Sequence, residues 1–143
     1  MQCALQLADK AGQAGEVPVG AVIVKGDIKI GEGYNQTIST FDPTAHAEIL
    51  ALRDAARQLG NHRIVDADLY VTIEPCTMCA GALVHARIAR LIYGAAEPKA
   101  GAIDSSIHVL ANPSLNHKVE VFAGICREAA AEKISAFFKT RRS

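Results

Sequence analysis

Hydrophobic residues along this chain follow two patterns, one with helical spacing and one of short continuous runs. Apolar positions that recur every three or four residues, together with helix-boundary signals, predict helices at 1–14, 45–59, 76–87 and about 124–139. Runs rich in Val, Ile, Leu and Ala predict strands at 19–25, 28–34, 67–74, 90–95 and 119–122. The chain therefore alternates helices and strands, which is typical of an α/β protein.

The segments between these elements indicate how they connect. Gly26-Asp27 lies between two strands and favours a tight β-hairpin. A strand, a helix and a strand then follow one another over 67–95 with short connections, which predicts a parallel βαβ unit. We expect a mixed five-stranded sheet flanked by helices in three layers. The connection at 96–116 is long, and loops of this length are usually functional or mobile.

Composition narrows the class of protein. The length of 143 residues suits a single domain (1–143), and half of the residues are hydrophobic, so the chain can form a core. Fifteen basic and fifteen acidic residues leave no overall basic field. No apolar run reaches the about 18 residues of a membrane span, and no signal-like leader is present. We expect a cytoplasmic protein whose Cys3 and Cys126 are reduced.

Three residues have the chemistry and spacing of a zinc site: His46, Cys76 and Cys79. The two cysteines stand at i and i+3, so on a helix both thiolates face one ion. Three protein ligands are typical of a catalytic Zn²⁺ that keeps its fourth position for water, and we expect one ion per subunit. A structural zinc would need a fourth ligand, for which the candidates are His62, Cys3 and Glu48.

Glu48 follows His46 by two residues, a spacing that places them together only in the first turn of a helix. Deeper in a helix, residues i and i+2 point about 200° apart, because each step turns about 100°. The Asp42-Pro43-Thr44 segment offers cap residues and an early proline for such a start. Zinc with two thiolates is neutral and acidifies water weakly, so a nearby carboxylate is needed. We predict that Glu48 is the general acid/base.

These residues resemble the zinc-dependent nucleoside and nucleobase deaminases, and more narrowly the bacterial tRNA-specific adenosine deaminases. The zinc motif carries the wider resemblance. The narrower one rests on EVPVGAV at 16–22, DPTAHAEI at 42–49, PCTMCAGA at 75–82, LNH at 115–117, FF at 137–138 and RR at 141–142. These segments span nearly the whole chain. The resemblance implies a cytidine-deaminase-like fold, a homodimer, and an RNA site built partly by the second subunit.

The resemblance also implies a reaction, the hydrolysis of the wobble adenosine of a tRNA anticodon to inosine with release of ammonia. Glu48 would move a proton from water to the purine N1 and then to the departing amine. The backbone N–H of Cys76 would stabilise the alkoxide that develops at C6. An anticodon loop suits this chemistry, because a base in a single-stranded loop enters a pocket at low cost.

Five residues match positions that bind substrate in the family: Asn35, Glu97, Lys99, Arg141 and Arg142. The amide of Asn35 suits a purine edge, although Asn after a strand also commonly makes a turn. Glu97 stands where the family usually has aspartate, near the ribose of the flipped nucleotide. The positive charges at 139–142, which include Arg141 and Arg142, suit phosphate groups. The alternative is that Lys99 is a solvated loop charge and that the two arginines are favourable charges at a helix C-terminus.

Two other functions stay open. One is a deaminase of a free nucleobase or nucleoside, of guanine or cytosine type, which the balanced charge favours. The other is a zinc-stabilised RNA-binding module without catalysis, and the presence of Glu48 argues against it. Phe137 and Phe138 are expected in the core rather than as base-stacking platforms. His117 is expected to be a packing or surface histidine, with orientation of its loop as the alternative.

Overall fold

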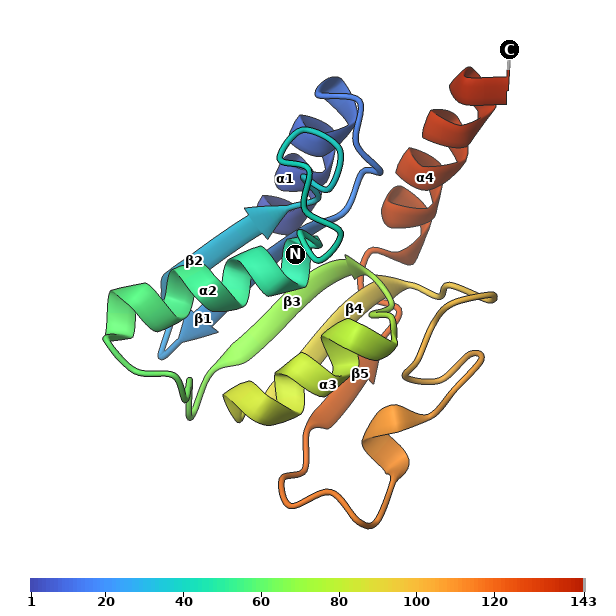
Figure 1. Cartoon of the computed structure of the whole chain (residues 1–143). Helices are drawn as coiled ribbons and strands as arrows, with labels where there is room; N and C mark the ends of the chain where they lie inside the picture. Colours follow the sequence, from blue (N-terminus) through green and yellow to red (C-terminus); the bar gives the residue numbers. More distant parts are fainter. Residues whose placement is uncertain (143) are drawn as a thin grey trace.

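The structure is a computed structural model that describes residues 1–142, and of Arg142 only the backbone. Within this range the helices and strands follow the predicted order, with one short 3-10 helix in addition (Figure 1). The helices are α1 (Gln2–Gln13), α2 (Ala47–Leu59), α3 (Thr77–Ala86), η1 (Val109–Ala111) and α4 (Arg127–Arg142). The strands are β1 (Gly20–Lys25), β2 (Ile28–Tyr34), β3 (Asp68–Ile73), β4 (Arg90–Ala95) and β5 (Glu120–Ala123).

The strands form one mixed sheet in the order β2-β1-β3-β4-β5. β1 is antiparallel to both β2 and β3, whereas β3, β4 and β5 run parallel. The predicted hairpin and βαβ unit are therefore confirmed. Gly26 and Asp27 have φ angles of 50° and 57°, and positive φ at both positions is the conformation that a two-residue hairpin turn requires.

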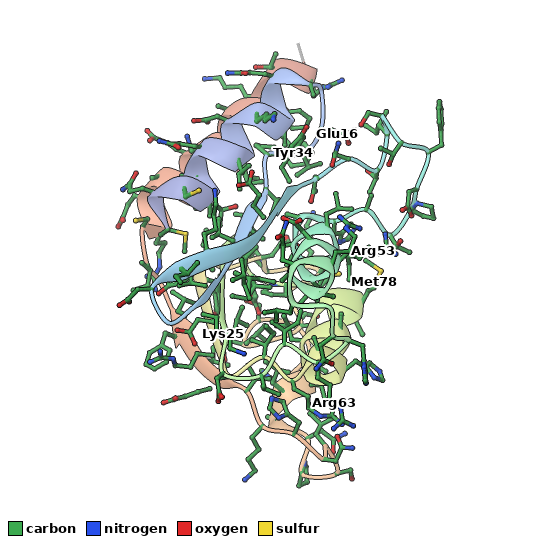
Figure 2. All side chains as sticks on the ribbon, turned by 90° about the vertical axis from the view of Figure 1, so that its left-hand side faces the viewer. Glu16, Lys25, Tyr34, Arg53, Arg63 and Met78 are labelled. Atoms are coloured by element: carbon green, nitrogen blue, oxygen red, sulfur yellow. The ribbon has the colours of Figure 1, made fainter. Side chains whose placement is uncertain are left out.

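Helices cover both faces of the sheet. α1 and α4 lie on one side and α2 and α3 on the other, so the molecule has the three expected layers (Figure 2). Two helix backbones approach the strands at glycines: a Cβ at Gly20 would lie 2.0 Å from the Ala4 oxygen, and one at Gly31 would lie 2.6 Å from the Ala51 oxygen. These glycines let α1 and α2 pack directly on β1 and β2.

The start of α2 differs from the prediction in its cap. The helix begins at Ala47 with His46 as N-cap residue, and Asp42 instead accepts hydrogen bonds from Thr44 N and Oγ1 (2.9 and 2.8 Å). The Ala47 N–H donates to Oδ1 of Asn35 at 2.8 Å. The cap predicted from the 42–44 segment is therefore wrong. The side chain that accepts a hydrogen bond from the first turn of α2 belongs to Asn35, which follows β2.

Other boundaries shift by a few residues. α3 begins at Thr77 with Cys76 as its N-cap residue, and α4 extends from Arg127 to Arg142 rather than from about 124 to 139. All four cysteines are free thiols, including Cys3 and Cys126. Among residues 1–142, no helix has the length and apolar character needed to cross a membrane.

Candidate active site

A cavity of about 410 Å³ opens where the N-terminal ends of α2 and α3 meet the C-terminal ends of β3 and β4. The cavity contains His46, Glu48 and Cys76 on the helix side. Apolar side chains of the segment before β1 and of α4 form the opposite walls. Helix N-termini at strand ends are the place where a ligand site is expected in an α/β sheet, and the structure has its cavity there.

The three expected ligands lie together with the geometry of a zinc site. Nδ1 of His46 is 3.6 Å from Sγ of Cys76 and 3.6 Å from Sγ of Cys79. Bonds of about 2.0–2.1 Å to nitrogen and 2.3 Å to sulfur at a tetrahedral angle separate the two ligand atoms by about 3.6 Å. In the described part of the chain, no other histidine, cysteine or carboxylate joins this group as a fourth ligand. The donor set therefore fits a zinc ion with an open position, and His62 and Cys3 do not close it.

The ligand side chains strongly affect one another's protonation. A hydrogen bond from Cys79, aided by His46, lowers the pKa of Cys76 to about 3. The same hydrogen bond and burial raise the pKa of Cys79, and the bond to Cys76 raises the pKa of His46. Metal binding requires deprotonated Cys79 and neutral His46, so zinc uptake releases protons at this site. Cys76 also lies at the N-terminus of α3, where the helix dipole favours a thiolate.

Glu48 lies in the first turn of α2 with its side chain buried at the cavity. Burial raises the pKa of this carboxyl to about 7, and the negative charge of Cys76 adds to the effect. A bound Zn²⁺ favours the carboxylate and lowers the pKa again. These two effects on the carboxyl of Glu48 oppose each other, and a carboxyl with a pKa near the working pH accepts and returns a proton readily. The position and environment of Glu48 thus suit a proton shuttle beside the metal.

Two further glutamates, Glu16 and Glu74, are as buried as Glu48, and sequence reasoning missed both. Glu16 accepts backbone hydrogen bonds from Ile38 (3.2 Å) and Ser39 (2.7 Å) at the base of the loop that follows β2 (Figure 2). Burial opposes the charge of both groups, but their hydrogen bonds outweigh burial and lower the pKa of each. The sequence offers one sign of such a residue, which is an acidic position within an otherwise apolar segment, as at Glu74 after β3.

The five substrate-binding candidates divide between the cavity and the surface. Asn35 and Glu97 line the cavity. Lys99 is exposed and outside the lining. Arg141 lies at a separate groove between α1 and α4, where Nη2 donates to the Gly15 oxygen at 2.8 Å. The side chain of Arg142 lies outside the described residues.

The C-terminal aromatic residues occupy different environments. The ring of Phe137 lies 4.8 Å from the Arg141 guanidinium and 5.3 Å from the ring of Phe138. Phe138 lines the cavity and is 44% exposed, so its expected place in the core is wrong. Nε2 of His117 hydrogen-bonds to the Ile88 oxygen at 2.7 Å, which joins its loop to the segment that follows α3.

Comparison with known families agrees with this geometry. Residues 1–95 match the family model described as the cytidine and deoxycytidylate deaminase zinc-binding region. The chain belongs to this deaminase family. As in the family, zinc is the cofactor, and in this chain His46, Cys76 and Cys79 are placed as its ligands.

Individual deaminases resemble the chain over nearly its full length. The tRNA-specific adenosine deaminase of Haemophilus influenzae is 52% identical over 144 residues, covering 99% of this chain and 83% of that protein. A solved structure from work on A-to-I editing by tRNA:A34 deaminases at the wobble position is 46% identical. It has a TM-score of 0.91 and covers 93% of this chain and 96% of its own. The guanine deaminase of Bacillus subtilis has 34% identity and a TM-score of 0.65, covering 99% and 91%.

Proposed function

We propose that this deaminase hydrolyses the wobble adenosine of a tRNA anticodon to inosine. The observation that carries the proposal is the similarity, over nearly the whole chain, to the tRNA-specific adenosine deaminase of Haemophilus influenzae at 52% identity. A structural match with a TM-score of 0.91 to a protein studied for wobble editing supports it. The single domain spanning 1–143 would then carry the complete zinc site. Its tRNA substrate places the activity in the cytoplasm.

The residues of the cavity would divide the chemistry among them. His46, Cys76 and Cys79 would hold zinc, which would polarise a water molecule so that Glu48 can deprotonate it. Glu48 would accept one proton of a water molecule and pass it to N1 of the purine. It would then take the proton of the hydroxyl group on C6 and give it to the amine, which leaves C6 as ammonia. The N–H of Cys76, at the start of α3, is placed to stabilise negative charge on the C6 oxygen.

The shape of the cavity favours a flipped base. Its walls include Val17, Ile73 and Ile134, whose apolar side chains suit the faces of a purine ring. A purine has to leave its stack to enter, and the loop of an anticodon allows this at little cost. The cavity thus suits a purine base, and a single-stranded loop is able to present one.

A free-base deaminase is the second candidate. The 34% identity to the guanine deaminase of Bacillus subtilis favours it, because the zinc chemistry is shared. The lower identity of that match, 34% against 46% and 52% for the two tRNA deaminases, argues for the tRNA substrate. A binding module without catalysis is disfavoured, since Glu48 is a buried carboxylate at the cavity and lacks the array of loop N–H donors that surrounds Glu16 and Glu74.

The experiment that tests the proposal compares substrates. A synthetic anticodon stem-loop with adenosine at the wobble position is incubated with the protein, beside free adenosine, guanine and cytosine. Inosine formed in the stem-loop alone is the expected result. Turnover of a free base with an inert stem-loop would retain the zinc mechanism and contradict the tRNA assignment.

Asn35 allows a more detailed prediction, since its side chain has two tasks. Its Oδ1 already accepts the Ala47 N–H at 2.8 Å, which leaves the Nδ2 donor as the group that best suits a base. We propose that Nδ2 donates to an acceptor on the purine edge. Asn35→Asp keeps the cap and removes the donor, so KM for the stem-loop should rise about 10-fold, the value of one hydrogen bond, at an unchanged melting temperature.

Asn35→Ala is the matched variant, because it removes both the donor and the cap. It should show the same rise in KM and, in addition, a loss of about 1 kcal/mol in the free energy of unfolding. If KM for Asn35→Asp equals the wild-type value, the side chain serves only as the cap of α2.

We also propose that the protein is a homodimer. The α2–α3 face has a mostly apolar groove of about 460 Å³, which would supply the contact between the subunits. The groove is lined by Ile49, Leu52, Arg53, Ala56, His62, Ile64, Ala82, His85 and Ala86. Light scattering at micromolar concentration should give twice the monomer mass, and Ala82→Glu should reduce it to the monomer. A wild-type monomer at this concentration would contradict the proposal.

A further inference from the structure

The carboxylate of Glu74 is surrounded by one loop. Glu74 follows β3 and precedes Pro75 and the zinc ligand Cys76, and its side chain is 4% exposed. The loop is the first part of the connection after β4, residues 97–105. It begins with Glu97 and Pro98, which line the cavity.

Both oxygens of Glu74 accept hydrogen bonds from this loop. Oε1 accepts from the N–H of Glu97 at 3.0 Å and from Oγ of Ser105 at 2.5 Å. Oε2 accepts from the N–H groups of Ile103 (3.1 Å), Asp104 (2.7 Å) and Ser105 (3.0 Å). One buried side chain therefore satisfies four backbone donors of a segment that forms no regular helix or strand.

The surroundings of the loop reinforce this arrangement. The Tyr93 hydroxyl donates to Asp104 Oδ2 at 2.6 Å, and the Ala102 N–H donates to the Pro75 oxygen at 2.8 Å. A Cβ on Gly101 would lie 2.5 Å from the carboxyl carbon of Glu74, so glycine leaves the room that the carboxylate needs. Of the two properties expected for the 96–116 connection, mobility does not suit its first part. Hydrogen bonds hold residues 97–105 to the ends of β3 and β4.

We propose that Glu74 is a positioning residue for the substrate, because it holds the 97–105 loop in the shape that forms one wall of the cavity. The inference rests on the proposed function for the identity of the substrate. Glu74 takes no part in the proton transfers at the metal. Its hydrogen bonds join the loop that carries Glu97 to the end of β3, which Cys76 follows in the chain. The distance between the loop and the metal ligands is therefore kept constant.

Glu74→Gln is the variant that tests this role. It preserves the volume of the side chain but turns an NH2 group toward N–H donors of the loop, which leaves buried donors unpaired. We expect KM for the stem-loop to rise about 10-fold or more while kcat stays within about 2-fold, since the zinc ligands and Glu48 are intact. Amide hydrogen exchange at 103–105 should accelerate, and zinc content should remain one per chain.

Two companion variants keep the test decisive. Ser105→Ala removes a single hydrogen bond from an exposed position, so it should fold normally and raise KM about 3-fold. Glu120→Gln, an exposed glutamate on β5, is the control and should leave both constants unchanged. If Glu74→Gln does not fold, Ser105→Ala decides the question.

The outcomes separate positioning from mere stability. A structural role alone would reduce the melting temperature and the active fraction, and therefore kcat, without changing KM. An unchanged KM in both variants would overturn the proposal. If the wild-type protein deaminates a free base and not the stem-loop, the proposed function fails, and KM for that base is then compared in the same variants.

Discussion

Glu48→Gln is expected to lower kcat for deamination of the anticodon stem-loop by at least about 10²–10⁴-fold, the usual contribution of a positioned general acid/base. Glutamine has nearly the same volume as glutamate, but it can neither accept a proton from water nor pass one to N1. Its amide fills the same buried position at the cavity, so substrate binding should change little. Single-turnover kinetics on the stem-loop measure the chemical step directly.

The same preparation must retain its metal and its fold for the result to concern catalysis. Zinc content should stay at one per chain, because Glu48 lies outside the ligand group of His46, Cys76 and Cys79. Glu32→Gln is a suitable control, since the carboxylate of Glu32 forms a surface ion pair with Lys29. A Glu48→Gln protein with wild-type activity would show that another group moves the proton, and the assignment of Glu48 as proton shuttle would be wrong.

Cys76→Ser is expected to lose zinc and to reduce deamination to the background rate. A hydroxyl is a much poorer zinc ligand than a thiolate, and removal of Cys76 leaves only His46 and Cys79 in the group. The protein should also unfold more easily, because a ligand at 100 times its Kd stabilises the native state by about 2.7 kcal/mol. Metal analysis, thermal unfolding and the stem-loop assay measure these three effects.

Chelation of the wild-type protein should reproduce the Cys76→Ser results and, unlike the mutation, should be reversed by added Zn²⁺. Cys3→Ser provides the matched control, since Cys3 lies on α1 outside the metal group. Full activity after complete removal of the metal would contradict the assignment of a zinc-dependent hydrolase.

The buried glutamates show how environment separates roles within one residue type. Glu48 is buried beside a thiolate, and burial raises its pKa. Burial also acts on Glu16 and Glu74, but several backbone N–H groups outweigh it and lower the pKa of each. These opposite shifts of chemically identical groups suit the roles proposed for them, a proton carrier in the first case and anions that bind loops in the others.

The amino-acid sequence by itself determined the elements and the metal chemistry of this protein. Helices and strands are predicted from residues that are close along the chain. The same holds for the turn at Gly26-Asp27 and for the pairing of Cys76 with Cys79 at i and i+3. Glu48 lies in the first turn of α2, as local helix geometry predicts, whereas His46 is the N-cap residue with an extended backbone and precedes the helix. Local rules suffice where the interacting residues are close along the chain.

Only the tertiary structure decided which distant residues meet. Asn35 caps α2 from 12 positions away, and Glu74 binds donors 23 to 31 positions further along. The separation of Arg141 from the cavity likewise depends on how α4 packs against α1. These contacts arise from the sheet order and the layering, which bring the ends of β2, β3 and β4 to one edge. Periodicity along the chain carries no information about such pairings, because a buried carboxylate and its loop are matched in space and not in sequence.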